Sequence, residues 1–149
     1  MRKVLIGETH PITLAGFERA IGMHPHLQLV GSHRDAHAFL EAAATSPDAV
    51  CVVDPEIFLR RPSLYGKLVA AERRILIWTG SDVGRAEPAW DPTLRAWILS
   101  KQATREALLR AIVLAAHGPG APSATTRPAV RLTPREREIA AAAVEGLQN

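Results

Sequence analysis

Short runs of apolar residues recur along the chain and are typical of buried strands. In most of the segments between these runs, the apolar residues are spaced as in an amphipathic helix, as Leu14, Phe17 and Ile21 are. Strands that alternate with helices pair in parallel through right-handed crossovers, so the pattern predicts a three-layer α/β domain. The predicted strands cover residues 4–6, 27–30, 49–53, 75–78 and 96–99.

The polarity of these runs predicts their order in the sheet. Residues 27–30 are the most polar and suit an edge, whereas residues 49–53 are apolar on both faces and suit the centre. This matches a flavodoxin-like, doubly wound parallel sheet of five strands in the order 2-1-3-4-5. A fourth helix is expected between the fourth and fifth predicted strands, but this segment contains Gly84, Pro88 and Pro92. Proline inside a helix costs about 3 kcal/mol, so we expect this fourth helix to be irregular: short, displaced or absent.

Composition divides the chain into three parts. Residues 1–117 carry the α/β pattern, and residues 118–132 have no apolar period and predict a flexible linker. Residues 133–149 begin with an N-cap threonine, Thr133, followed by Pro134 at the first helical position and Glu136 in a capping box. We therefore expect a short helix whose apolar stripe has nothing within this chain to pack on.

Composition also excludes several classes of protein. The chain has 149 residues, near the ~150 of one domain, with 47% hydrophobic and 22% charged residues. A single cysteine excludes a disulfide framework and a cysteine-based zinc site, and is typical of a reducing compartment. The longest clean apolar run, residues 111–116, is far below the ~20 residues that cross a bilayer. We expect a cytoplasmic protein with no membrane partner.

The charge pattern does not by itself indicate a nucleic-acid partner. The net charge is +3, and no segment is basic enough to indicate nucleic acid by charge alone. Trp78, Trp90 and Trp97 are interpreted as core or interface groups rather than platforms for stacked bases, because no basic stripe interleaves with them along the sequence.

Polar side chains follow the predicted strands at their carboxyl ends, where open doubly wound sheets bind ligands. Glu8 and Thr9 follow the first strand and Asp54 follows the third. Thr79 ends the fourth strand and Lys101 follows the fifth. Converging carboxylates indicate a divalent cation or a phosphoryl site. A hydroxyl and an ammonium that face an aspartate are the groups that phosphoryl transfer needs.

Four short segments carry these residues in the order and spacing of a known family. VLIGETHP at residues 4–11 is followed by Gly16 and Phe17, DAVCVVD spans 48–54, IWT spans 77–79 and LSK spans 99–101. Together they resemble the CheY-like receiver domains of response regulators of the NarL/FixJ class. LTPREREI at 132–139, with EGLQN at 145–149, is similar to the first helix of a LuxR-type helix-turn-helix domain.

The resemblance implies a two-component regulator of transcription that is not an enzyme. It implies that Asp54 is the phosphoacceptor, Thr79 the switch hydroxyl and Lys101 the lysine that binds the phosphoryl group. Glu8, Asp54 and the backbone of Glu56 would form the acidic, metal-binding pocket. The implied partners are a histidine kinase, a second copy of the chain and DNA. We expect no DNA-binding residue within this chain, because the helix that would read DNA lies beyond it.

The chain departs from the family pattern at this pocket. Thr9 stands where the family has the second of two adjacent acids, so the resemblance implies a Mg²⁺ affinity that is weakened or absent. The loop after Asp54 also lacks the family's D-x-x-M-P pattern. We expect an atypical receiver with a degenerate pocket, in which Glu8 either binds metal or pairs with Lys101. The alternatives are a phosphorylation-independent receiver-like adaptor for a ligand or partner, and an Asp-based phosphohydrolase.

Overall fold

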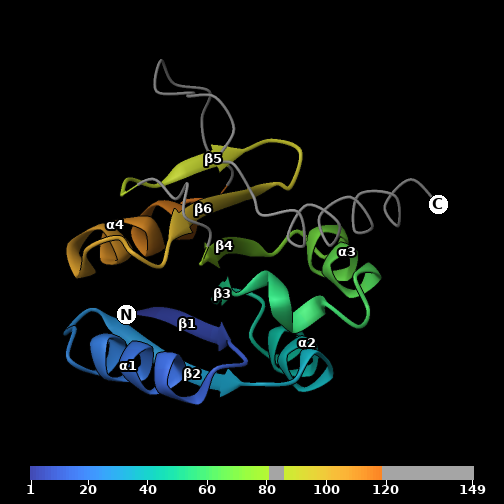
Figure 1. Cartoon of the computed structure of the whole chain (residues 1–149), viewed down its shortest axis with the longest axis horizontal. Coiled ribbons are helices and arrows are strands. Elements are labelled where there is room, and N and C mark those ends of the chain that lie inside the picture. Colours follow the sequence, from blue (N-terminus) through green and yellow to red (C-terminus); the bar gives the residue numbers. More distant parts are fainter. Residues whose placement is uncertain (81–85, 119–149) are drawn as a thin grey trace.

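The computed structural model describes residues 1–80 and 86–118, so the predicted linker and the predicted helix at 133–149 lie outside the described residues. Strands and helices alternate over most of the chain (Figure 1). No helix in the described ranges is long and apolar enough to cross a membrane. The elements are β1 (Arg2–Gly7), α1 (Pro11–Gly22), β2 (Leu27–His33), α2 (Ala36–Thr45), β3 (Val50–Val53), the 3₁₀ helix η1 (Pro55–Phe58), α3 (Ser63–Ala70), β4 (Arg74–Thr79), β5 (Ala89–Asp91), β6 (Ala96–Ser100) and α4 (Arg105–Ala116).

The sheet confirms the predicted α/β architecture and corrects its strand count. It has six strands in the order β2-β1-β3-β4-β6-β5. The five predicted strands correspond to β1, β2, β3, β4 and β6, which pair in parallel in the predicted order. The sixth strand, β5, was not predicted, and it pairs with β6 in the antiparallel direction.

The additional strand β5 lies where the sequence suggested an irregular fourth helix. Pro88 and Pro92 flank it, and proline interrupts a helix but is tolerated beside an edge strand. Asp91 then begins a turn, because its carboxylate accepts hydrogen bonds from the amides of Thr93 (2.8 Å) and Leu94 (3.1 Å). Within the described residues, the connection between β4 and β6 contains this strand and no helix.

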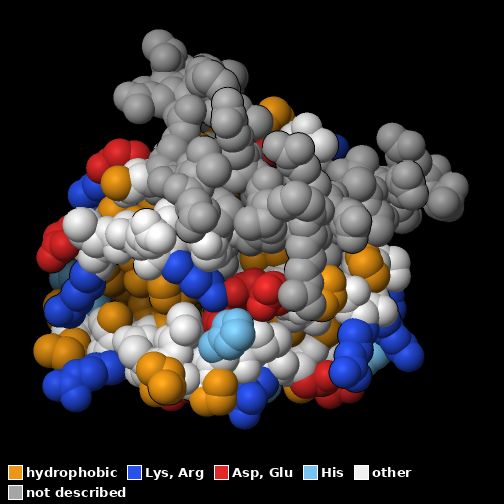
Figure 2. Space-filling model, in the orientation of Figure 1, with side chains coloured by type: hydrophobic (Ala, Val, Ile, Leu, Met, Phe, Trp, Pro, Cys, Tyr) orange, Lys and Arg blue, Asp and Glu red, His pale blue; other side chains and the backbone are white. Residues whose placement is uncertain are grey.

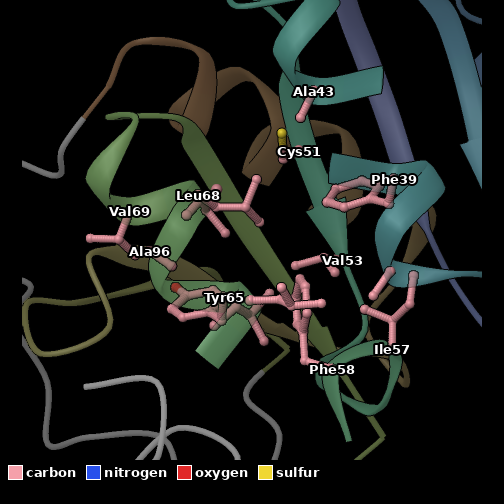
Figure 3. Packing of buried hydrophobic residues seen from close by; sticks show 14 of the residues in the cluster. Phe39, Ala43, Cys51, Val53, Ile57, Phe58, Tyr65, Leu68, Val69 and Ala96 are labelled. Carbon is pink, nitrogen blue, oxygen red and sulfur yellow. The ribbon is translucent and has the colours of Figure 1, made fainter. Parts of the chain in front are cut away.

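Helices cover both faces of the sheet and bury one apolar cluster on each (Figure 1). On the face of α2 and α3, Phe39, Phe58 and Leu68 pack against inward-facing residues of β3 such as Val53 (Figure 3). On the face of α1 and α4, Phe17, Ile21 and Ile112 pack against Val50 and Val52. Alternate residues of β3 thus enter opposite clusters, which explains why its sequence is apolar throughout.

Gly7 allows the core to approach the end of β1 closely. A β-carbon at this position would lie 3.0 Å from the ring of Phe39 and 3.1 Å from Ile57. Those distances are too short for a side chain without displacement of the neighbours, so a larger residue here would disturb packing directly beneath the next residue, Glu8.

Helix α3 ends in a Schellman motif built on a residue other than glycine. The Arg73 amide donates to the carbonyl of Leu68 (3.1 Å), and the Glu72 amide donates to that of Val69 (2.9 Å). Glu72 adopts φ 55° there, and Arg95 adopts φ 52° at the start of β6. A residue with a β-carbon is strained in this left-handed region of backbone conformation, and glycine is the usual residue at such a helix end.

Candidate functional site

The carboxyl ends of the central strands bring four of the predicted site residues together. Glu8 follows β1, Asp54 follows β3, Thr79 ends β4 and Lys101 follows β6. Backbone hydrogen bonds hold these ends in register: the Asp54 amide donates to Gly7 (2.9 Å), and the Lys101 amide donates to Thr79 (2.8 Å). On the face of the molecule shown in Figure 2, acidic side chains gather beside a histidine.

Lys101 bridges the two buried carboxylates. Its Nζ donates to Glu8 Oε1 (3.2 Å) and Oε2 (2.9 Å), and also to Asp54 Oδ2. The Glu8 and Asp54 side chains are 1% and 5% exposed, whereas that of Lys101 is 18% exposed. Buried carboxylates are costly unless they are paired, so the ammonium is the group that makes this arrangement tolerable.

Backbone amides also donate hydrogen bonds to the two carboxylates. The His10 amide donates to Glu8 Oε1 (3.2 Å), and the Glu56 amide donates to Asp54 Oδ1 (2.8 Å). The side chains of these same two residues, His10 and Glu56, approach each other to 3.4 Å between Nε2 and Oε2. No sequence pattern predicts the pairing of these two side chains, because the contact joins the segments that follow β1 and β3.

The electrostatics of the bridge follow from burial and from close opposite charges. Burial raises the pKa of Glu8, and the negative charge of Asp54 raises it further, although the hydrogen bond from Lys101 acts in the opposite direction. Burial alone would lower the pKa of Lys101. The hydrogen bonds and charges of Asp54 and Glu8 outweigh this effect and raise it. Lys101 is therefore a permanent cation at neutral pH.

The other predicted residues lie around this bridge. Thr79 is fully buried at the end of β4. Thr9 is half-buried and lines a neighbouring cavity of about 480 Å³ together with Arg34 and Arg60. The structure therefore joins Glu8, Asp54 and Lys101 by direct hydrogen bonds, while Thr9 stands beside this group.

The donor groups in this structure do not fit a Mg²⁺ ion. The carboxylate oxygens of Glu8 and Asp54 hold the Lys101 ammonium. The carbonyl of Glu56, the expected backbone ligand, accepts a hydrogen bond from the Leu59 amide (3.1 Å). Across residues 1–80 and 86–118, no three His, Cys, Asp or Glu side chains gather in a metal-binding arrangement. Mg²⁺ demands several oxygen ligands in near-octahedral geometry.

Comparison with solved structures identifies the fold. The chain is similar to the signal receiver domain of NarL from Mycobacterium tuberculosis, with 21% identity over 78% of this chain and 97% of that one and a TM-score of 0.60. The chain has the receiver-domain fold. It is also similar to the isolated REC domain of RcsB from Salmonella enterica serovar Typhimurium in the apo form, with 19% identity, coverage of 76% and 86%, and a TM-score of 0.57.

A third receiver domain shows the same likeness at lower sequence identity. The response regulator receiver domain from Clostridium thermocellum has 14% identity, coverage of 78% of this chain and 95% of that one, and a TM-score of 0.59. No protein-family model and no curated protein matches the chain. The structural likeness therefore confirms the predicted CheY-like fold.

Proposed function

We propose that residues 1–117 are the receiver-like signal-input domain of a transcriptional response regulator, and that their pocket works without Mg²⁺-dependent phosphorylation. The observation that carries this proposal is the Lys101 bridge between Glu8 and Asp54, at the edge of the sheet where this fold binds ligands. In this bridge an ammonium holds the two carboxylates that would have to supply the ligands of a divalent cation.

The bridge also restrains Asp54 as a nucleophile. Oδ1 accepts the Glu56 amide and Oδ2 accepts the Lys101 ammonium, so each oxygen already has a donor. These donors draw electron density from both oxygens and make Asp54 a weaker nucleophile, although each oxygen keeps a second lone pair, and no second acid follows Glu8 to recruit a metal. The proposal is that a signal acts by binding one state of the domain better than another.

The output side of the proposal rests on the sequence outside the described residues. Residues 132–149 resemble the start of a LuxR-type helix-turn-helix domain, which indicates DNA as the final partner. A structure of RcsB bound to promoter rprA is similar to this chain over 77% of the present chain and 61% of RcsB. We propose that the present domain controls such a DNA-binding domain as a homodimer, because dimerisation sets the spacing of half-sites.

Intact-mass measurement tests the pocket directly. The wild-type chain, Asp54→Asn and Thr9→Asp are each incubated with Mg²⁺ and acetyl phosphate. We expect no adduct on the wild type or on Asp54→Asn, and a gain of Mg²⁺ binding in Thr9→Asp, which restores an acid beside Glu8. A Mg²⁺-dependent phosphoryl adduct on the wild type that disappears in Asp54→Asn would contradict the proposal and direct the search to a histidine kinase.

A reporter assay tests the regulatory role. Residues 1–132 are joined to a monomeric DNA-binding domain whose operator is a pair of half-sites. We expect the fusion to occupy the operator more strongly than the DNA-binding domain alone, because a homodimer presents two reading helices together. Equal occupancy, with a monomeric mass by sedimentation, would argue against control through dimerisation.

A further inference from the structure

A cavity of about 590 Å³ lies at the opposite end of the sheet from Asp54. Its walls are formed by the amino-terminal ends of β4 and β6, by the turn between β5 and β6, and by the end of α4. The residues that matter for its chemistry are Arg73, Arg74, Trp90, Arg95, Trp97 and His117. Cavities of this size accommodate small organic ligands.

Two tryptophans give this cavity an aromatic wall. Trp90 of β5 is the register partner of Trp97 of β6, so the two side chains share one face of the sheet. Their ring centroids are 5.8 Å apart, with the planes inclined at 64°. The indole N–H of Trp97 is buried and has no hydrogen-bond partner among the described residues. A buried donor without an acceptor is costly, and a ligand would reach this N–H only if the indole shifted.

Three arginines surround the aromatic wall. Arg73 and Arg74 come from the start of β4 and Arg95 from the turn before β6. In the described part of the chain, none of the three forms a salt bridge with a carboxylate, although Glu72 also lines the cavity. The four charged side chains of the cavity carry a net charge of about +2 with His117 neutral.

Strained backbone places two of these arginines. Glu72, directly before Arg73, has φ 55°, and Arg95 itself has φ 52°. Residues other than glycine rarely adopt this conformation, and here it sets the direction in which the chain leaves α3 and enters β6. Along the sequence no basic stripe interleaves with the tryptophans, which predicts core or interface groups. In the structure, Arg95 lies in the turn between the two tryptophans, and Arg73 and Arg74 reach the same cavity from the start of β4.

We propose that this cavity binds an anionic ligand with a planar aromatic ring, of the nucleotide type. Guanidinium groups hold phosphate or carboxylate oxygens through paired hydrogen bonds, and indole rings stack on a flat ring. The end of α4 lines the same cavity through Ala115, His117 and Gly118. A bound ligand therefore contacts the point at which the chain continues towards residues 119–149. Any effect on DNA binding rests on the proposed function, whereas ligand binding does not.

Titration with three related probes separates the two parts of this recognition. Adenosine 5′-monophosphate carries both a ring and an anion, adenosine carries the ring alone, and inorganic phosphate carries the anion alone. Tryptophan fluorescence and calorimetry follow binding to the full chain. We expect saturable binding of the monophosphate, with adenosine and phosphate each weaker by about tenfold or more. Failure of the monophosphate to saturate at millimolar concentration, or equal binding of adenosine, would overturn the proposal.

Matched arginine variants locate the binding. The double variant Arg74→Gln with Arg95→Gln should bind adenosine 5′-monophosphate more weakly by about tenfold or more, because two charge-assisted contacts are lost. Arg60→Gln is the control, since Arg60 is exposed and lines the separate cavity beside Thr9. It should change affinity by less than about twofold. An unchanged affinity in the double variant would overturn the proposal. That result would not bear on the mass measurement at Asp54, so the proposed ligand site and the proposed function can fail independently.

Discussion

Replacing Lys101 with methionine removes the cation from the pocket while keeping a side chain of similar length. In the wild type, Nζ donates to both oxygens of Glu8 and to one oxygen of Asp54. In Lys101→Met these carboxylates, 1% and 5% exposed, would face each other without the ammonium and would keep the hydrogen bonds from the His10 and Glu56 amides. The variant thus isolates the contribution of the bridge.

The expected loss is large because both charges remain buried. Removing one partner of a buried ion pair costs about 3–5 kcal/mol in the free energy of unfolding. Repulsion between Glu8 and Asp54 adds to this cost, whereas uptake of a proton by either carboxylate limits it. Lys101→Met should therefore be destabilised by about 3–5 kcal/mol at neutral pH, with a smaller loss in mildly acidic solution.

Urea denaturation followed by far-ultraviolet circular dichroism measures this loss. Lys3→Met is the control, because Lys3 pairs with Asp48 at 3.5 Å in an exposed position (42% and 61%), where an ion pair contributes about 1 kcal/mol or less. If Lys101→Met unfolds within about 1 kcal/mol of the wild type, the bridge does not stabilise the pocket and the reasoning is wrong.

Three further changes probe other parts of the molecule. Burial and the charge of Asp54 raise the pKa of Glu8 above its usual 4.5, so the folded state binds this proton more tightly and loses stability as pH rises through 4.5 and past the raised pKa. Glu8→Gln should therefore gain in melting temperature relative to the wild type as pH rises above 4.5, and a constant difference would contradict this. Glu72→Gly should raise the free energy of unfolding by about 1 kcal/mol by relieving φ 55°, as thermal denaturation would show; no gain would mean that the turn is not strained. Tyr65→Phe removes the hydrogen bond that the buried hydroxyl donates to the Leu94 carbonyl (2.6 Å) and should cost about 1–3 kcal/mol in urea denaturation; wild-type stability would refute this.

Much of the fold could be predicted because the apolar runs are short, regular and separated by helical patterns. The apolar run at residues 49–53 could be placed at the sheet centre because both of its faces are buried. The rule that parallel strands present their carboxyl ends at one edge was enough to predict that Glu8, Asp54, Thr79 and Lys101 lie together. Their functional roles remain predictions.

The remaining features depend on contacts between distant segments. β5 has three residues, too few for a periodic pattern, and it exists because Ala89 and Asp91 pair with β6. The pairing of Glu8 with Lys101 was one of two alternatives in the sequence, because a carboxylate at a strand end is compatible with a metal or with an ammonium. The Trp90 and Arg74 side chains line one cavity only because the turn between β5 and β6 approaches β4.

The short antiparallel strand β5 has a consequence for the behaviour of the protein in concentrated solution. An exposed parallel strand such as β6 would offer a row of unpaired amides and carbonyls on which a strand of another molecule could assemble. β5 covers that row, and it presents only three residues of its own, between Pro88 and Pro92. Short edges flanked by proline are poor templates for strand addition. The residues that displace the expected helix therefore protect this side of the sheet from aggregation.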